Sequence, residues 1–254
     1  MSFSTPSRLT SVLTLACALS VGACVATSSA THESSGELPA DWRSSSTLRF
    51  EALVKQLAGR RPGFWCASER SELGRALDGP GEVALRAAVL LAHSDGDDDR
   101  SLLIKRLERR VPSPTRAHDA VDVVAAAALE RASALSPGLD GPNTMALRLA
   151  ALASGTHPHP DLEVRVECAR VALTSGVDSV TPFLIRVLRA GTPAERQDRG
   201  DWEPSTTLTW SKHRAAQALS QRAHVPCRFR PDGSWQHQMD EAQRLETLLL
   251  GKRP

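Results

Sequence analysis

Apolar residues along most of the chain recur at three- and four-residue intervals, the spacing of one face of an α-helix. These stretches are separated by Pro and Gly, and no stretch alternates apolar and polar residues in the manner of a strand. The predicted helices fall into pairs at 47–60 and 67–77, 82–93 and 98–111, 114–133 and 142–155, 161–174 and 178–190, and 206–223 and 239–250. We therefore expect an all-α fold.

Several of these helices are rich in alanine and apolar on more than one side. The segment 82–93, EVALRAAVLLAH, is apolar almost all round. A helix of this kind has to be covered on several sides, and alanine lets neighbouring helices approach closely. Stacked helix pairs provide that cover, because each pair lies between two others. The pattern predicts an α-solenoid of about five helix pairs.

An internal repeat supports this prediction. Arg86 and Arg165 lie in similar apolar contexts 79 residues apart, and Arg214 follows 49 residues later. The first spacing is about two periods of the 40–47 residues found in HEAT and armadillo arrays, and the second is one period with an insertion.

One unit carries a recognisable motif. Asp161-Leu162-Glu163-Val164-Arg165 is followed by small residues at Ala169 and Ala172, an Asp at 178 and a Pro at 182. This unit resembles the HEAT-like repeats first associated with phycobilin lyases, and the units near 82–111 and 206–250 match it more loosely. The resemblance implies that residues 47–254 form a HEAT-like helical repeat domain.

Two polar insertions, 191–204 and 224–238, interrupt the last part of the array. They carry Trp202, Phe229 and Trp235, with Trp210 between them and Arg228 and Arg230 on either side of Phe229. Insertions in solenoids often lie on the binding face, so these six residues are candidates for partner contact. The alternative is that the aromatic residues fold back as a cap over the terminal helix pair.

The N-terminus resembles the signal peptide of a bacterial lipoprotein. Residues 1–23 contain Arg8, a short apolar stretch from Leu9, and Val21-Gly22-Ala23 directly before Cys24. This pattern predicts a lipid on Cys24, a flexible tether over 24–46, and an anchor in the cell envelope, with Val25 favouring the outer membrane facing the periplasm. Cleavage after Ala30, which would leave a secreted protein without an anchor, is the alternative.

Charge and cysteine content narrow the function further. The 31 basic and 29 acidic residues almost balance, which argues against a nucleic-acid partner. Beyond the lipid site, Cys66, Cys168 and Cys227 allow at most one internal disulfide, and the sequence leaves the pairing open. Cys168 lies on an apolar helix face, and we expect it to be a core residue.

Candidate chemistry is sparse. His157 and His159, with Asp161 completing the set, could hold a metal, although the prolines around them also fit a plain turn between helices. The acidic run at 95–99 lacks the spacing of an EF-hand and fits an acidic first helical turn. Arg106, Arg109 and Arg110 are expected on a solvated helix face. No nucleophile or phosphate-loop motif is present, so no catalysis and no cofactor is predicted.

The sequence thus favours a membrane-anchored interaction module that binds an unidentified protein or envelope component. Two alternatives remain. One is an envelope enzyme or metal-binding protein that uses the His157/His159 loop, and the other is a structural lipoprotein that assembles with itself.

Overall fold

A computed structural model of the chain describes residues 38–57, 60, 62–79, 81–110, 116–130, 144–191 and 206–251. Within these ranges the protein is all-helical and contains no strand, which confirms that the fold is all-α. The helices are α2 (Thr47–Leu57), α3 (Ala67–Ala76), α4 (Gly81–Ser94), α5 (Asp97–Glu108), α6 (Arg116–Ala128), α8 (Thr144–Ser154), α9 (Leu162–Thr174), the 3₁₀ helix η1 (Asp178–Val180), α10 (Thr181–Leu188), α12 (Thr206–Arg222) and α13 (Trp235–Leu250).

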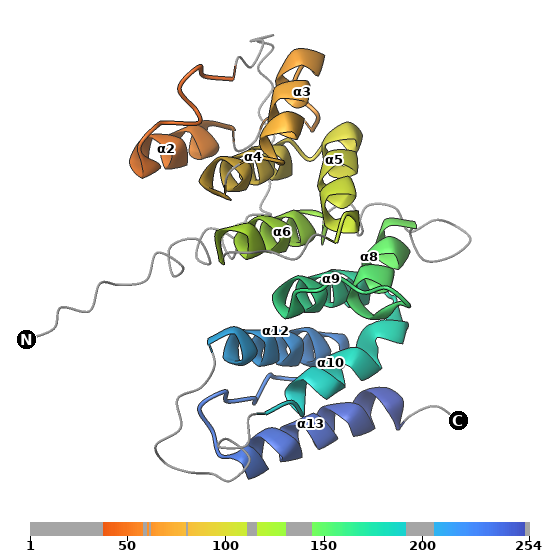
Figure 1. The fold of residues 1–254 in the computed structure, drawn as a ribbon. Coiled ribbons are helices and arrows are strands. Elements are labelled where there is room, and N and C mark those ends of the chain that lie inside the picture. The colour runs from red at the N-terminus through yellow and green to blue at the C-terminus, as the bar shows by residue number, and fades with distance from the viewer. Residues whose placement is uncertain are drawn as a thin grey trace, which may run out of the picture.

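Most of the helices belong to one of two groups that run along the molecule (Figure 1). In the first group, α4, α6, α9 and α12 lie side by side as a row, each in contact with the next. The helices α5, α8 and α10 lie along one side of this row. Each of these three also contacts at least one helix of the row: α5 contacts α4 and α6, α8 contacts α9, and α10 contacts α9 and α12. Every described helix of the row is therefore covered on more than one side.

Alanine forms much of the contact surface within this row. Ala84, Ala87 and Ala88 of α4 are completely buried, as are Ala169 and Ala172 of α9. A methyl side chain costs little conformational entropy in a helix and lets two backbones lie close together. Leucines and valines fill the remaining space, and a single hydrophobic core runs from Trp42 to Leu245. The alanine content of the sequence is thus explained by packing between helices.

The folded part begins earlier than the sequence suggested. Residues 38–46 belong to the predicted tether, but the side chain of Trp42 is only 1% exposed. Its Nε1 donates a hydrogen bond to Oε1 of Glu72 at 2.9 Å, and Arg86 donates to its main-chain carbonyl at 3.0 Å. An indole side chain buries a large apolar area and still needs a partner for its N–H. Trp42 therefore anchors the segment before α2 to α3 and α4.

The last helix also begins earlier than expected. The sequence predicts the second polar insertion at 224–238, whereas α13 starts at Trp235. Ser234 provides the reason, because its hydroxyl accepts a hydrogen bond from the main-chain N–H of His237 and so caps the helix. The described loop is therefore about 12 residues long, from Ala223 to Ser234.

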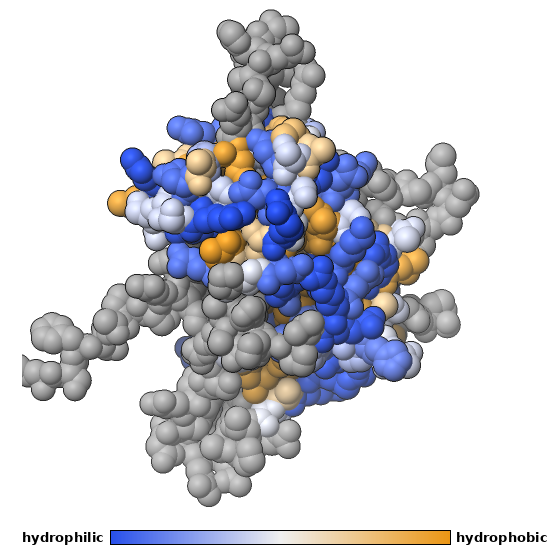
Figure 2. Space-filling view, turned by 45° about the horizontal axis from the view of Figure 1, so that its top comes forward, coloured by the Kyte–Doolittle hydropathy of each residue, from blue (hydrophilic) through white to orange (hydrophobic). Residues whose placement is uncertain are grey.

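The surface is mostly polar. Figure 2 shows a face on which hydrophilic residues dominate and hydrophobic ones are scattered in small groups. Among the described residues, Leu48 and Leu147 are the large apolar side chains that are exposed. No described helix combines the length and the apolar character needed to cross a bilayer.

Candidate functional site

The loop before α13 folds back against the last two helices. Phe229 is only 5% exposed and belongs to the hydrophobic core. Arg244 donates to the carbonyl of Pro226 at 3.2 Å, the main-chain N–H of Arg228 donates to Glu241, and His237 donates to the carbonyl of Arg228. These bonds fix the loop on α13. The arrangement corresponds to the cap that the sequence offered as one of two interpretations.

A buried lysine contributes to the same cap, and no pattern in the sequence predicts its burial. Lys212 on α12 is 1% exposed, and its Nζ donates to Oε1 of Gln238 at 2.7 Å. The amide of Gln238 then donates to the carbonyls of Pro231 and Gly233. The Nζ of Lys212 also lies 5.2 Å from the centre of the Trp235 ring, within cation–π range. In sequence Lys212 looks like any surface lysine, since the partners that bury it are 20 or more residues away.

The six candidate partner-binding residues are therefore not equivalent. Arg228 and Arg230 are exposed and form no ion pair within the part of the chain that the structure describes. Trp210 and Trp235 are half-buried, and Trp210 lies under Arg214. Phe229 points into the core, and Trp202 lies outside the described residues. The cap thus leaves the two arginines exposed and the two indoles partly exposed.

The histidine loop between α8 and α9 separates its two histidines. His157 is exposed, whereas His159 is 1% exposed, with its main-chain N–H bound to the carbonyl of Leu152 at 2.8 Å. The ring of His159 lies between two carboxylates. Its Nε2 is 3.5 Å from Oδ2 of Asp122, and its Nδ1 is 3.8 Å from Oδ2 of Asp161. The structure thus places Asp161 and Asp122 next to His159, whereas the exposed His157 lies outside this cluster.

Asp122 comes from α6, 37 residues before His159, and it is almost completely buried. Nε of Arg106 on α5 donates to Oδ1 of Asp122 at 2.8 Å, and Nη1 of the same arginine donates to the carbonyl of Leu77 at 2.6 Å. The prediction that Arg106 lies on a solvated face is therefore wrong. Its side chain connects α5 to Asp122 on α6 and to the carbonyl of Leu77, directly after α3. The only sequence signal for Asp122 is a single acid inside an apolar helical stretch.

The acidic run at 95–99 is neutralised by arginines. Asp99 is fully buried and accepts hydrogen bonds from Arg70 at 2.9 Å and from the hydroxyl of Ser94 at 2.6 Å. Arg100 pairs with Asp95 and Asp97, and Arg70 also pairs with Asp98. These carboxylates hold the first turn of α5 in place, as the reading of an acidic helix start predicted.

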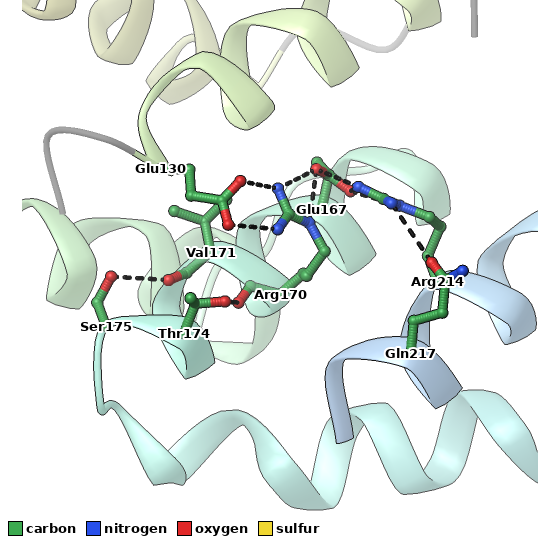
Figure 3. Close-up of polar contacts among 8 residues, drawn as sticks. All are labelled: Glu130, Glu167, Arg170, Val171, Thr174, Ser175, Arg214 and Gln217. Carbon is green, nitrogen blue, oxygen red and sulfur yellow. Dashed lines mark hydrogen bonds and ion pairs between the residues drawn. The ribbon is translucent and has the colours of Figure 1, made fainter. Parts of the chain in front are cut away.

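A second buried network joins three helices of the row (Figure 3). Arg170 on α9 donates two hydrogen bonds of 2.8 Å to the carboxylate of Glu130, just after α6, and one to Glu167. Glu167 in turn accepts from Arg214 on α12. Both Glu167 and Arg170 are less than a tenth exposed. Two arginines and two glutamates thus form one chain of ion pairs, in which Arg170–Glu130 and Arg214–Glu167 are bidentate.

The electrostatics of this network follow from burial and pairing. Burial opposes ionisation of the Glu167 carboxyl, but Arg170 and Arg214 outweigh it, so the pKa of Glu167 lies below its usual value. Burial alone would lower the pKa of Arg170, and the two glutamates raise it. The neighbouring Cys168 thiol is fully buried, and desolvation with help from Glu167 and Asp122 raises its pKa. Cys168 is therefore an unreactive core residue, as expected.

The other two cysteines are on the surface. Cys66 and Cys227 are both exposed, and all three described cysteines are free thiols. The Cys66–Cys227 bridge that the sequence left open is therefore not formed.

Four of the ion pairs between helices join residues 40 to 47 positions apart, whereas others, such as Arg70–Asp99 and Arg189–Glu246, join residues 29 and 57 positions apart. Arg148 pairs with Glu108 and Arg170 with Glu130, each 40 residues apart, while Arg222 with Asp178 and Arg214 with Glu167 are 44 and 47 residues apart. In each case an arginine reaches back to a carboxylate one helix pair earlier. The spacing equals the period range of HEAT and armadillo arrays.

No known protein family, curated protein or solved structure shows significant similarity to the chain.

Proposed function

We propose that the chain is a lipid-anchored interaction module of the bacterial cell envelope, built as a HEAT-like solenoid of about five helix pairs. The observation that carries the solenoid is the set of arginine–carboxylate pairs separated by 40 to 47 residues. In a solenoid each repeat contacts its neighbours, so interactions recur at the repeat length. The row of α4, α6, α9 and α12 supports the same arrangement.

The anchor rests on the sequence before and at Cys24. Two cysteines of the N-terminal segment provide a matched pair for testing it, because Cys17 also follows Leu15-Ala16 but would leave a shortened apolar core. We expect Cys24→Ser, expressed in a bacterial host, to abolish labelling by radioactive palmitate and to leave the signal peptide uncleaved. Cys17→Ser should be labelled like the unchanged protein. Full labelling of the Cys24→Ser protein would refute the anchor.

The proposed partner surface is the C-terminal cap, with Arg228 and Arg230 as the contact groups. These arginines are exposed and lie on one loop, and the side chain of neither forms an ion pair among the described residues. The loop that carries them is fixed by Phe229 and by bonds to α13, so little further ordering is needed on binding. A partner with acidic or aromatic groups at its surface would complement them. We expect this partner to be a protein or another envelope component.

The test is a cross-linked pull-down from host membranes with the full chain. Arg228→Ser/Arg230→Ser removes two positive charges at the cap, and Arg75→Ser/Lys105→Ser removes two from exposed sites on α3 and α5. We expect the first variant to lose the specific partner and the second to retain it. Equal recovery with both variants would place the binding face elsewhere. Deleting the whole loop would be a poorer test, because it would also remove the buried Phe229.

A further inference from the structure

The buried cluster at the junction of α6 and α9 contains groups that prefer metal ions and lacks a complete set of hydrogen bonds. His159, Asp122 and Asp161 each place one ligand atom so that all three atoms lie within 4.8 Å of one another. His159 is 1% exposed, and its Nε2 has no hydrogen-bond partner within the described structure. A buried polar atom without a partner costs free energy, so its surroundings call for an explanation.

The separation of Nε2 and the Asp122 carboxylate is informative. Nε2 of His159 and Oδ2 of Asp122 are 3.5 Å apart, longer than the usual range for an N–H···O hydrogen bond. Two ligands of a tetrahedral zinc ion, each about 2.1 Å from the metal, lie about 3.4 Å apart. The observed distance therefore fits two ligand atoms around one metal better than it fits a donor and an acceptor.

Neighbouring groups already orient both ligands. Arg106 occupies Oδ1 of Asp122 at 2.8 Å, so Oδ2 is the oxygen that faces His159. The main chain of His159 is fixed on α8 by its bond to Leu152. Contacts of this outer kind are what hold metal ligands in position.

From this geometry we infer that the cluster is a binding site for a first-row divalent metal ion of the zinc class. Nε2 of His159 and Oδ2 of Asp122 are two ligands, and the carboxylate of Asp161 is the third. Three protein ligands leave one coordination position for water or for a group of a partner. The bound ion would join α6 to the start of α9 and so link the third helix pair to the fourth. The exposed His157 is not part of this site.

Binding requires one local rearrangement. The main-chain N–H of Asp161 donates to Nδ1 of His159 at 3.2 Å, which keeps the proton of the neutral ring on Nε2. When a metal takes Nε2, that proton moves to Nδ1 and the bond from the Asp161 N–H is lost. Asp161 then shifts, and its carboxylate moves into contact with the ion. No proton leaves the ring in this step.

The first test is a titration of the untagged full chain with Co²⁺, followed by displacement with Zn²⁺. We expect one equivalent of Co²⁺ with the visible absorption of a tetrahedral oxygen and nitrogen site, and no sulfur-to-cobalt charge-transfer band in the near ultraviolet. A charge-transfer band would instead indicate the exposed thiols of Cys66 and Cys227 and would overturn the assignment. Absence of any tetrahedral spectrum would overturn it as well.

Variants separate the proposed ligands from the neighbouring histidine. We expect His159→Gln, Asp122→Asn and Asp161→Asn each to weaken Co²⁺ binding by at least ~10–100-fold. His157→Gln, two residues away and exposed, should bind as the unchanged protein does. Loss of binding in His157→Gln with retention in His159→Gln would refute the assignment. Since replacing His159 or Asp122 disturbs a buried site, circular dichroism must show a native helix content, and Asp161→Asn, at a half-buried position, is the mildest of the three.

Two further readouts do not depend on those variants. At a hundredfold excess over its dissociation constant, Zn²⁺ should raise the unfolding midpoint of the unchanged protein by roughly 5–10 °C, and EDTA should reverse the shift. The amide resonance of Asp161 should move on Zn²⁺ binding, because its hydrogen bond to Nδ1 is lost. An unchanged midpoint together with an unmoved amide would mean that the cluster is only a polar contact. This outcome would leave the proposed anchor and partner surface untouched.

Discussion

At the scale of single residues, several charged side chains lie in the interior of this protein, where each is paired with an opposite charge. Glu167 is almost completely buried between Arg170 and Arg214, and Asp99 and Asp122 each accept from an arginine. A buried pair need not stabilise a fold more than apolar residues would, but loss of one partner leaves a charge without compensation. These residues should therefore be sensitive to substitution and to acid.

Glu167→Gln should reduce the free energy of unfolding by about 3 kcal/mol at pH 7, because Arg170 and Arg214 lose their shared counter-charge. The pKa of Glu167 is lower in the folded protein than the ordinary value of about 4.3 in the unfolded chain. Its contribution is thus complete above about pH 4.3 and is lost as the pH falls through the folded-state pKa. Urea unfolding at several pH values should show the difference between the two proteins shrinking below about pH 4. Glu163→Gln on the same helix is the matched control at pH 7: Glu163 forms no ion pair in the described structure, so its replacement should change the free energy of unfolding by less than about 0.5 kcal/mol.

At the scale of elements, the close approach of two loops sets the start of α5. The main-chain N–H of Gly63 donates to the carbonyl of Ser94 at 2.7 Å, and a Cβ placed on Gly96 would lie 2.6 Å from Cα of Gly63 and 2.8 Å from Asp99. Only a residue without a side chain fits between them. Backbone atoms cannot move aside as a flexible side chain can.

Gly96→Ala should therefore destabilise the protein by about 1–3 kcal/mol, since the added methyl group overpacks a backbone contact. Gly74→Ala is the matched control. A Cβ at Gly74 would meet only the end of the Leu102 side chain at 3.3 Å, and alanine favours the interior of α3 by up to about 1 kcal/mol. Thermal unfolding should show a lower midpoint for the first variant and an equal or higher midpoint for the second. Equal losses in both would contradict the proposed contact.

The segment before α2 behaves as an element of the fold although it forms no helix. We expect Trp42→Ala to cost about 3–5 kcal/mol, because it removes a fully buried indole and leaves Glu72 without its N–H partner. Leu48→Ala, on the exposed side of α2, should change stability by less than about 0.5 kcal/mol. Denaturant unfolding of the two variants measures both values. A small effect of Trp42→Ala would indicate that residues 38–46 belong to the flexible tether and not to the folded domain.

At the scale of the whole molecule, the helix pairs are joined by the row of stacked helices and by the ion pairs between them. If the pairs are repeats, stability is a sum of terms within each pair and terms between neighbours. Arg170 belongs to the second kind, because it joins Glu130 after α6 to Glu167 on α9. Weakening this junction should separate the two halves of the row.

Arg170→Met should lower stability by about 3 kcal/mol and make the unfolding of α4 and α6 precede that of α9 and α12, or follow it. Hydrogen exchange measured by mass spectrometry resolves the two halves. Arg186→Met, at an exposed position on α10, should keep a single cooperative transition. A single transition in Arg170→Met as well would argue against independent repeats.

The sequence by itself determined the helices, because their apolar spacing, capping residues and prolines are local. The bounds of α9 and α12 fall within one residue of the predicted ones, and Cys168 lies in the core as its helical face indicated. Local pattern failed where an interaction reaches far along the chain. Trp42 looked like part of a polar tether because Glu72 and Arg86 are 30 and 44 residues away.

Only the tertiary structure decided which polar residues are buried together. Asp122 lies 3.5 Å from His159, which is 37 residues later in the chain, and Lys212 donates a hydrogen bond to Gln238. Phe229 is buried, while Arg228 and Arg230 beside it are exposed. The sequence alone does not distinguish a solvated charged residue from a buried one. The free energy of burying the charge depends on the partners that folding brings to it. The sequence therefore defined the helices and their order, and the packing of those helices created the sites.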